Sequence, residues 1–343
     1  MRFPEFTEEW EETELQDIVS NICSGKDKIS NSGEVVLYGS TGVIGRTNSA
    51  SYKEKVVLVA RVGANAGQMQ IGNAPCGVTD NTLVLDAKEW NYYIYYFLQH
   101  YNLNRLVFGS GQPLITGGML KKIKVRYGCK AERNNITQLL FLMDERIATQ
   151  NKVIEDLKLM KSAIAETIFN AVQGRIASLS TICDVTKGKQ VNGEELLEKG
   201  EYYVMNGGVT PSGYYDQYNT PAETISISEG GNSCGYVQYN KVPFWSGGHC
   251  YTLQGIDTEV DNQYLFHYLK RYESSIMNLR IGTGLPNIQK KDLEDFRIIL
   301  PPSKIQKEIA ACLTSIEDKI GIEVHWLACV QKEKQCLLRQ MFI

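Results

Sequence analysis

Two stretches of the chain place apolar residues at alternating steps of four and three, the heptad pattern of helices that pack along one seam. The first seam consists of Ile136, Leu140, Met143, Ile147, Ile154, Leu157 and Ile164. The second repeats it 173 positions later, with Ile309, Leu313, Ile316, Ile320, Leu327, Val330 and Leu337. The pattern predicts two long amphipathic helices, at residues 131–173 and 304–343.

Both seams are interrupted by polar residues at the same two places. Gln150 and Lys161 stand in the first seam, and Glu323 and Lys334 stand in the second. Packing the two helices together buries both apolar stripes, while polar residues at such positions lower stability and fix the register. We therefore expect a paired coiled coil. The alternative is that each helix lies on its own domain.

The segments before each helix are short β-rich runs broken by glycine. In the first segment, strands are predicted at 35–38, 56–61, 82–85 and 123–127. In the second, they are predicted at 202–205, 224–228, 250–253 and 296–300. One helix interrupts each set, at 92–101 and at 262–272. Each globular part is therefore expected to be α+β with a strand-dominated core.

Glycine and proline positions indicate that the two globular segments are copies of one another. Gly63, Gly67 and Pro75 recur 168 positions later as Gly231, Gly235 and Pro243. After an insertion of five residues, Gly109, Gly111, Pro113 and Ile115 recur as Gly282, Gly284, Pro286 and Ile288. One polypeptide thus carries two copies of a globular unit, each followed by a helix.

Polar side chains gather in glycine-rich segments of both copies, where the backbone can approach a ligand closely. Residues 38–47 and 206–215 are predicted to be turns. Asn and Gln can bond adenine bidentately, and Arg can bond guanine in the same way. The candidates for DNA contact are Ser40, Thr41, Arg46, Arg61, Asn65, Gln68, Lys189, Asn206, Thr210, Ser212, Tyr214, Asn232 and Gln238. The plainer interpretation is that they are ordinary turn residues.

The overall charge argues against a protein that binds nucleic acid, whereas the distribution of the charges is compatible with that function. The chain has 36 Lys and Arg against 39 Asp and Glu, a formal net charge of −3. A domain that binds nucleic acid is usually basic. The cations, however, gather in the first copy, and the acids gather at the N-terminus and in the second copy. A patchy field on a near-neutral protein can still hold phosphates.

The sequence shows no signature of catalysis or of a metal site. Residues 39–47 resemble a phosphate-binding loop, but Gly39 and Gly45 are six apart and Arg46 follows in place of Lys. The four histidines are scattered, and the nine cysteines show no metal-ligand spacing. No leader and no run of 18 apolar residues is present, so we expect a cytoplasmic protein without a membrane span. Because no catalytic signature is found, we also expect the protein to be non-catalytic.

Several short motifs carry a family resemblance. They are the opening 3–6 (FPEF) with Trp10 and Leu15, the turn 282–288 (GTGLPNI), and 300–302 (LPP) leading into 305–310 (IQKEIA). Phe169 and Phe342, again 173 apart, stand near the ends of the two helices. With the duplicated units, these motifs resemble the specificity subunit of Type I restriction-modification systems.

The resemblance implies an α+β fold with two pseudo-symmetric β-rich target recognition domains, separated by a pair of long antiparallel coiled-coil helices. Residues 1–130 and 174–303 would be the recognition domains, and 131–173 and 304–343 the spacer helices. Each domain would read one half of a bipartite, asymmetric site in double-stranded DNA. A helix of about 40 residues spans on the order of 60 Å, which bounds the distance between the two domains.

The resemblance also implies partners that carry the chemistry. Modification (methyltransferase) subunits and restriction/translocase subunits would dock on this chain. The chain itself would hold no cofactor, because S-adenosylmethionine, ATP and Mg are expected on the partner subunits. Since those subunits can share in neutralising phosphates, the isolated chain is expected to bind DNA poorly. Two other functions stay open: a coiled-coil scaffold whose paired domains bind protein or carbohydrate, and a stand-alone DNA-modifying enzyme.

Overall fold

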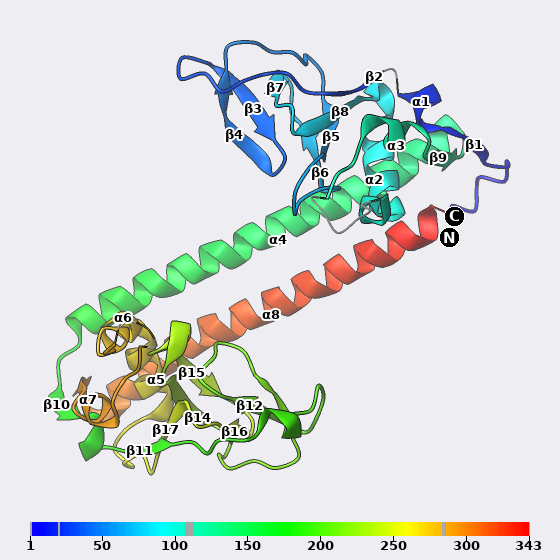
Figure 1. Cartoon of the computed structure of the whole chain (residues 1–343). Coiled ribbons are helices and arrows are strands. Elements are labelled where there is room, and N and C mark those ends of the chain that lie inside the picture. The colour runs from blue at the N-terminus through cyan, green and yellow to red at the C-terminus, as the bar shows by residue number, and fades with distance from the viewer. Residues whose placement is uncertain (1, 20, 107–112, 283, 285, 343) are drawn as a thin grey trace. The chain divides into compact units, whose positions relative to one another are not determined.

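The computed structural model describes residues 2–19, 21–106, 113–282, 284 and 286–342 (Figure 1). The chain divides into two compact units: unit 1 contains Met1–Lys152 and His325–Ile343, and unit 2 contains Val153–Val324. Of the positions in the repeat and in the turn 282–288, Gly109, Gly111, Thr283 and Leu285 lie outside the described residues.

Unit 1 is built on two small sheets and a separate pair of antiparallel strands. The four-stranded sheet has the order β2 (Asn21–Ser24), β8 (Thr82–Asp86), β5 (Val56–Ala60), β6 (Met69–Gly72). The three-stranded sheet has the order β4 (Gly42–Thr47), β3 (Val35–Gly39), β7 (Cys76–Val78), in which only β3 and β7 are parallel. The separate antiparallel pair is β1 (Glu11–Glu14) with β9 (Lys124–Tyr127).

Unit 2 repeats this topology strand for strand. Its four-stranded sheet has the order β11 (Asp184–Lys187), β17 (Cys250–Gln254), β14 (Thr224–Ser228), β15 (Val237–Asn240). Its three-stranded sheet has the order β13 (Gly213–Tyr215), β12 (Tyr202–Met205), β16 (Trp245–Ser246), and its separate pair is β10 (Arg175–Ser178) with β18 (Arg297–Leu300). The internal duplication predicted from glycine spacing therefore holds in the fold.

One helix packs on each four-stranded sheet, α2 (Asn91–Tyr101) in unit 1 and α5 (Asn262–Arg271) in unit 2. The carboxylate of Asp261 caps α5 by accepting a hydrogen bond from the Tyr264 amide. The shorter helices are α1 (Leu15–Ile18), α3 (Gly117–Lys121), α6 (Glu273–Met277) and α7 (Lys290–Glu294). Single 3₁₀ turns are η1 (Lys88–Trp90), η2 (Leu103–Leu106), η3 (Leu179–Thr181), η4 (Gly193–Glu195) and η5 (Gly231–Ser233).

Strand β5 shows how the core of unit 1 is divided. All five of its residues are buried, because both faces of the sheet are covered. Val57 and Val59 pack into the cluster that contains α2, while Val56 and Leu58 pack with Tyr38 of the second sheet. In unit 2, Ile225 and Ile227 of β14 enter the main core. Because successive side chains of a strand point to opposite faces of the sheet, the five residues of β5 contribute to two buried faces.

The two long helices are α4 (Lys130–Ala171) and α8 (Ser303–Met341). In unit 1, Asp144 of α4 contacts Lys334 of α8, and Ile136, nearer the start of α4, shares a cluster with Met341. In unit 2, Lys161 contacts Glu317, and Phe169 shares a cluster with Ile309. As residue numbers rise along α4, the numbers of the residues that they contact on α8 fall. Within each unit the two helices therefore run antiparallel.

The residues of the heptad seam lie on the inner side of these helices. Ile136, Leu140, Met143, Ile154, Ile309, Leu313 and Val330 are buried. Ile147, Leu157, Ile164, Ile316, Ile320, Leu327 and Leu337 are half-buried. The predicted α+β class is confirmed, as are the eight strands and the two helices predicted in the copies. No helix in the described ranges is long and apolar enough to cross a membrane.

The prediction that residues 38–47 form a turn is wrong. Strand β3 continues to Gly39, a two-residue turn follows, and β4 begins at Gly42, which pairs with Gly39. Gly42 has φ +130°, a conformation open to glycine, so the chain reverses tightly and the β-branched residues after it continue as a strand. Residues 206–215 also end in a strand, β13, which is only three residues long and was not predicted from the sequence.

Candidate nucleic-acid interface

A charged residue follows directly after the strands that occupy the same place in the two four-stranded sheets. Arg61 follows β5, and Glu229 follows β14, 168 positions later. We call the group Ser24, Arg61 and Asn81 the strand-end site of unit 1. The group Lys187, Glu229 and His249 is the strand-end site of unit 2. Each group joins the last residue of one strand, the residue after a second and the residue before a third.

In unit 1, two of the residues proposed from sequence converge on this site. The Arg61 guanidinium donates from Nη1 to the Ser24 hydroxyl at 3.3 Å. The Ser40 hydroxyl, in the turn between β3 and β4, donates to the Asn81 carbonyl at 2.9 Å. Thr41, also in this turn, is exposed. The hairpin turn is therefore fastened beside Arg61, whose own amide donates to the same Asn81 carbonyl.

In unit 2, a buried carboxylate organises the equivalent site. Glu229 is 7% exposed, and its Oε1 accepts from Lys187 Nζ at 2.6 Å and from the Tyr251 hydroxyl at 3.1 Å. Its Oε2 lies 3.4 Å from His249 Nδ1. Burial, and after it the charge of Glu229, raises the pKa of the Tyr251 hydroxyl, which keeps it protonated as a donor. The side chains of Lys187 and His249 extend outward, 51% and 65% exposed.

Asn206 is the third candidate that the structure brings to a strand end. Its Oδ1 accepts from the backbone N–H of His249 at 3.1 Å, so it fixes the segment that precedes β17. The Ser228 hydroxyl donates to the Gly207 carbonyl at 2.6 Å and holds the same loop. The loop after β12 thus takes the place that the β3–β4 turn takes in unit 1.

The other candidates of unit 1 lie in two different settings. Arg46 is exposed on β4, and its Nη1 donates to the Glu34 carbonyl at 2.5 Å. Asn65 and Gln68 bond each other in the turn after Arg61, with Gln68 Nε2 donating to Asn65 Oδ1 at 3.0 Å. Asn65 lies between Gly63 and Gly67, whose φ angles are +80° and +91°, and Gln68 follows directly after Gly67.

The remaining candidates of unit 2 are spread over several elements. Asn232 is exposed on η5, and Thr210 and Ser212 are exposed before β13. Tyr214 is half-buried on β13, and Gln238 lies on β15 opposite Ser226 rather than in a loop. Lys189 is exposed, and its carbonyl accepts from the Trp245 indole at 2.7 Å.

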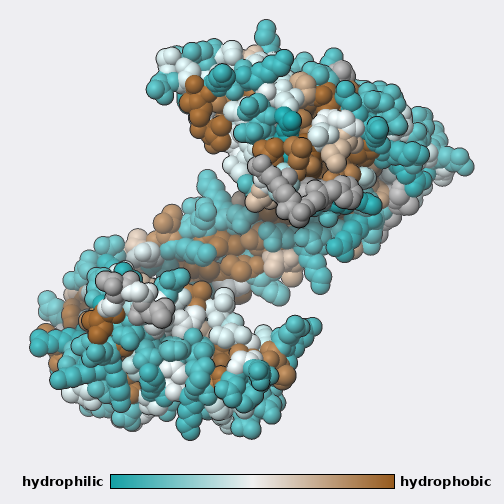
Figure 2. Space-filling view, viewed as in Figure 1, coloured by the Kyte–Doolittle hydropathy of each residue, from teal (hydrophilic) through white to brown (hydrophobic). Residues whose placement is uncertain are grey.

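Unit 1 also exposes apolar side chains on the edge strand β4, as the brown atoms over that strand show (Figure 2). Val43 and Ile44 on β4 are 61% and 43% exposed, and Ile29 beside them is 61% exposed. Arg46 lies on the same strand. The edge therefore combines an apolar surface with a cation.

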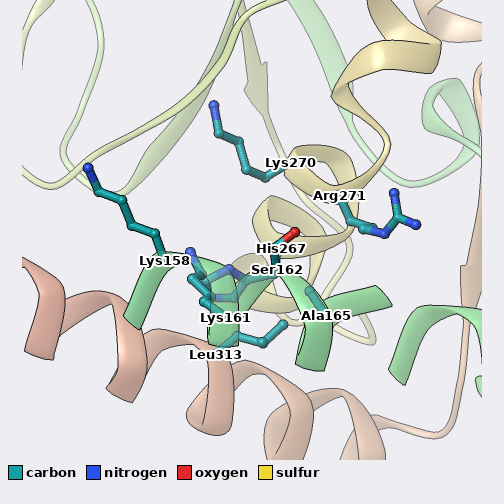
Figure 3. Close-up of a pocket in the computed structure, with 8 residues that line it drawn as sticks. All are labelled: Lys158, Lys161, Ser162, Ala165, His267, Lys270, Arg271 and Leu313. Atoms are coloured by element: carbon teal, nitrogen blue, oxygen red, sulfur yellow. The ribbon is translucent and has the colours of Figure 1, made fainter. Parts of the chain in front are cut away.

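Four cations and a histidine line a cavity of about 230 Å³ in unit 2 (Figure 3). Lys158 and Lys161 come from α4, and His267, Lys270 and Arg271 come from α5. Most of the charge is matched by acids: Lys161 by Glu317 at 2.7 Å, Lys270 by Glu273 at 2.6 Å and Arg271 by Glu166 at 3.5 Å. This cavity belongs to the packing of α4 on α5 and α8, and it is a weaker candidate for a phosphate site.

Sequence reasoning missed Lys187, Glu229 and His249 as a group. Neither His249, whose place in unit 1 is taken by Asn81, nor Glu229 was among the predicted site residues. The signal was nevertheless present, since Arg61 and Glu229 both stand two residues before the matched glycines Gly63 and Gly231. Among the described residues, no three His, Cys, Asp or Glu side chains gather closely enough to hold a metal ion.

Comparison with known families identifies the class of protein that this fold and these sites define. The model of the Type I restriction modification DNA specificity domain matches twice, at residues 7–159 and 175–330. These two matches cover most of the chain and follow the duplication. The chain belongs to this family, and the resemblance predicted from the sequence is confirmed.

Curated relatives agree with this assignment. The chain is 23% identical to a putative Type I specificity subunit of Mycoplasma genitalium, across 96% of this chain and 91% of that protein. It is 24% identical to the putative specificity subunit of the Type I restriction enzyme MjaX of Methanocaldococcus jannaschii, across 97% of this chain and 93% of the relative. A putative specificity subunit of Mycoplasma pneumoniae is 35% identical over 42% of this chain and 38% of its own length.

Solved structures show the same fold. The crystal structure of the Type I restriction-modification system S subunit from M. genitalium superposes with a TM-score of 0.77, at 19% identity, over 97% of this chain and 96% of that one. A chain from a structural study of complex assembly and conformational transition in the Type I restriction-modification system superposes with a TM-score of 0.56, at 16% identity, over 98% of each chain.

Proposed function

We propose that this chain reads a bipartite, asymmetric site in double-stranded DNA, with residues 1–130 and 174–303 as its two target recognition domains. The observation that carries the proposal is a duplicated scaffold of the specificity family whose matched strand ends bear unlike side chains. A guanidinium stands in one copy where a carboxylate and an ammonium stand in the other. Equal scaffolds with unequal donors and acceptors are suited to read two unequal half-sites.

We further propose that the long helices, residues 131–173 and 304–343, dock modification and restriction/translocase subunits. Their outer faces support this, because they carry large apolar side chains in water. Leu159 and Met160 of α4 are 69% and 45% exposed, and Ile322 of α8 is 62% exposed. A docked subunit would cover these apolar side chains and remove them from water. S-adenosylmethionine, ATP and Mg belong, in this proposal, to the partner subunits, and this chain carries no chemistry of its own.

Mapping methylated adenines in a genome that expresses this chain with its modification subunit tests the proposal. We expect one bipartite motif, with two different half-sites separated by a fixed number of unspecified base pairs. Exchanging residues 1–130 for those of another family member should change one half-site and leave the other intact. Methylation that ignores this exchange, or methylation by the purified chain alone, would contradict the proposal.

A further inference from the structure

We propose that the strand-end sites are the base-reading positions of the two units: Arg61 reads a guanine in one half-site, and Lys187, oriented by Glu229, reads a guanine in the other. This inference rests on the proposed DNA-reading function and names the residues and the base that would carry it. Arg and Lys are donor-only groups, and both pair with the O6 and N7 acceptors of guanine in the major groove.

The backbone is the same at both positions. The Arg61 amide donates to the Asn81 carbonyl at 3.0 Å, and the Glu229 amide donates to the His249 carbonyl at 2.9 Å. The Arg61 carbonyl accepts from Ile115, and the Glu229 carbonyl accepts from Ile288, both at 2.8 Å. The two sites are thus one framework, and their difference lies in the side chains.

The matched glycine turns are anchored equally. The Gly63 amide donates to the Pro113 carbonyl at 3.1 Å, and the Gly231 amide donates to the Pro286 carbonyl at 3.0 Å. Each anchor joins the turn after the strand end to the turn that precedes Ile115 or Ile288 in the chain. The side chains at the strand ends therefore project from a backbone that is held on both sides.

In unit 1 the guanidinium has capacity to spare. Its one described side-chain bond, from Nη1 to Ser24, is long, and the buried Nε has no partner among the described residues. The described ion pairs include none with Arg61. A guanidinium offers five N–H donors in a planar fork, so most of them are left for a ligand. Because Nε is buried, the donors that the guanidinium offers to a base edge are those of its terminal amino groups.

In unit 2 the charged group at the strand end cannot reach a ligand by itself. Glu229 is too buried to meet a base edge, but its carboxylate holds Lys187 and lies beside His249, and both of these side chains face outward. A buried carboxylate is tolerated only with such partners. Glu229 is therefore a positioning residue, and Lys187 is the residue that meets DNA.

The different chemistry of Arg61 and Lys187 predicts that the two residues discriminate guanine from other bases to different degrees. Arginine can bond O6 and N7 of guanine together through its planar fork, whereas the lysine ammonium acts as a point charge that several acceptors satisfy. We expect the guanine read by Arg61 to be nearly invariant in the target. The guanine read by Lys187 should tolerate substitution more readily.

The test uses the full chain with its modification subunit, and the readout is the methylated motif. Arg61→Ala should relax guanine at one position of one half-site, with roughly tenfold or greater loss of preference, and should leave the other half-site unchanged. Lys187→Ala should do the same in the other half-site. Glu229→Gln should reproduce the effect of Lys187→Ala at the same base position, whereas a purely structural role would lower methylation at all sites equally.

Matched controls remove an exposed cation from the same unit. Lys53→Ala in unit 1 and Lys199→Ala in unit 2 should leave the motif unchanged. Arg61→Gln and Lys187→Gln, which preserve most of the side chain and remove its charge, decide the matter if an alanine variant fails to fold. An unchanged motif in folded Arg61 and Lys187 variants would overturn this inference while leaving the bipartite reading intact. Absence of any bipartite motif with the wild-type chain would instead overturn the proposed function.

Discussion

At the scale of single residues, the equivalent positions of the two copies explain the ion pairs between the long helices better than residue type alone does. Lys161 and Lys334 interrupt the two seams 173 positions apart, and each contacts an acid on the facing helix, Glu317 or Asp144. The two acids are themselves 173 positions apart. Sequence alone located the lysines, because they break an apolar pattern. It did not locate the acids, because a carboxylate beside a seam looks the same as any solvated surface carboxylate.

His267 occupies a position where the copies differ, since Tyr96 stands at its place in unit 1: three residues earlier, Tyr93 contacts Phe342 as Tyr264 contacts Phe169. The His267 side chain is 2% exposed, and its Nε2 lies 2.9 Å from the Thr314 hydroxyl. Burial, and after it the charge of Lys161, lowers the pKa of His267 to about 4, although Glu317 and Asp261 act in the opposite direction. The folded protein therefore holds this imidazole neutral.

This gives a pH prediction with a definite sign. Between pH 6.5 and 4, the unfolded chain binds a proton at His267 that the folded chain refuses, so stability falls as the pH falls through this window. The full effect is about 3 kcal/mol. His267→Gln, which removes the titrating imidazole, should flatten the decline. Urea unfolding at pH 6.5, 5.5 and 4.5 measures it, and parallel curves for the two proteins would show that the imidazole is not held neutral.

At the scale of elements, the heptad pattern, the strand runs and the interrupting helices were predictable because each follows a local period. The strands β4, β6, β7 and β13 were not, since they are three to six residues long and rich in glycine, tyrosine or polar residues. Their pairing depends on partner strands: β4 pairs with β3 across a two-residue turn, and β7 pairs with β3 from a distant part of the sequence. A short run of this kind acquires its conformation from the sheet that it joins.

The ion pairs of the helices allow a test of register. Lys161→Glu in unit 2 would place two carboxylates together, since Glu317 lies 2.7 Å from the lysine. The free energy of unfolding should fall by about 2 kcal/mol. Lys161→Glu combined with Glu317→Lys should recover most of this loss, because the contact is restored with reversed polarity. Urea unfolding of the single and double variants measures the coupling.

A surface pair supplies the matched control. Lys290 and Glu294 form an i,i+4 pair at 3.4 Å on α7, with 53% and 31% of their side chains exposed. Lys290→Glu should change stability by no more than about 0.5 kcal/mol. An equal loss at both places, or a double variant as unstable as the single one, would mean that Lys161 does not set the helix register.

At the scale of the whole molecule, the sequence predicted two copies and two helices, and the structure shows how the helices are shared. Each compact unit takes the N-terminal part of the helix that follows its own globular part and the C-terminal part of the other. The 173-residue offset predicted equal helices. It could not predict which parts join which unit, because that depends on packing. Phe342 packs on Tyr93 and Phe97 of unit 1, and Phe169 packs on Tyr264 and Tyr268 of unit 2.

Helix length gives a prediction at this scale. Inserting one heptad into α4 after Lys152 and one into α8 after Val324 keeps both seams in phase. Each insertion adds roughly 10 Å at 1.5 Å per residue, close to three base pairs of about 3.4 Å each. We expect both half-sites to persist with a spacer about three base pairs longer, measured by mapping methylated adenines. Insertion into one helix alone should abolish methylation, and an unchanged spacer in the double insertion would disprove a ruler role for the helices.

The placement of Phe342 has a consequence for biosynthesis. Ribosomes make residues 325–342 after everything in unit 2, yet Met341 and Phe342 lie inside the hydrophobic cluster of unit 1. The globular part translated first therefore cannot close its interior until this late segment emerges, whereas unit 2 has all of its residues earlier. Domains usually fold in the order of translation. Here unit 2 can complete its folding first, whereas the hydrophobic cluster of unit 1 stays incomplete until the end of the chain has been made.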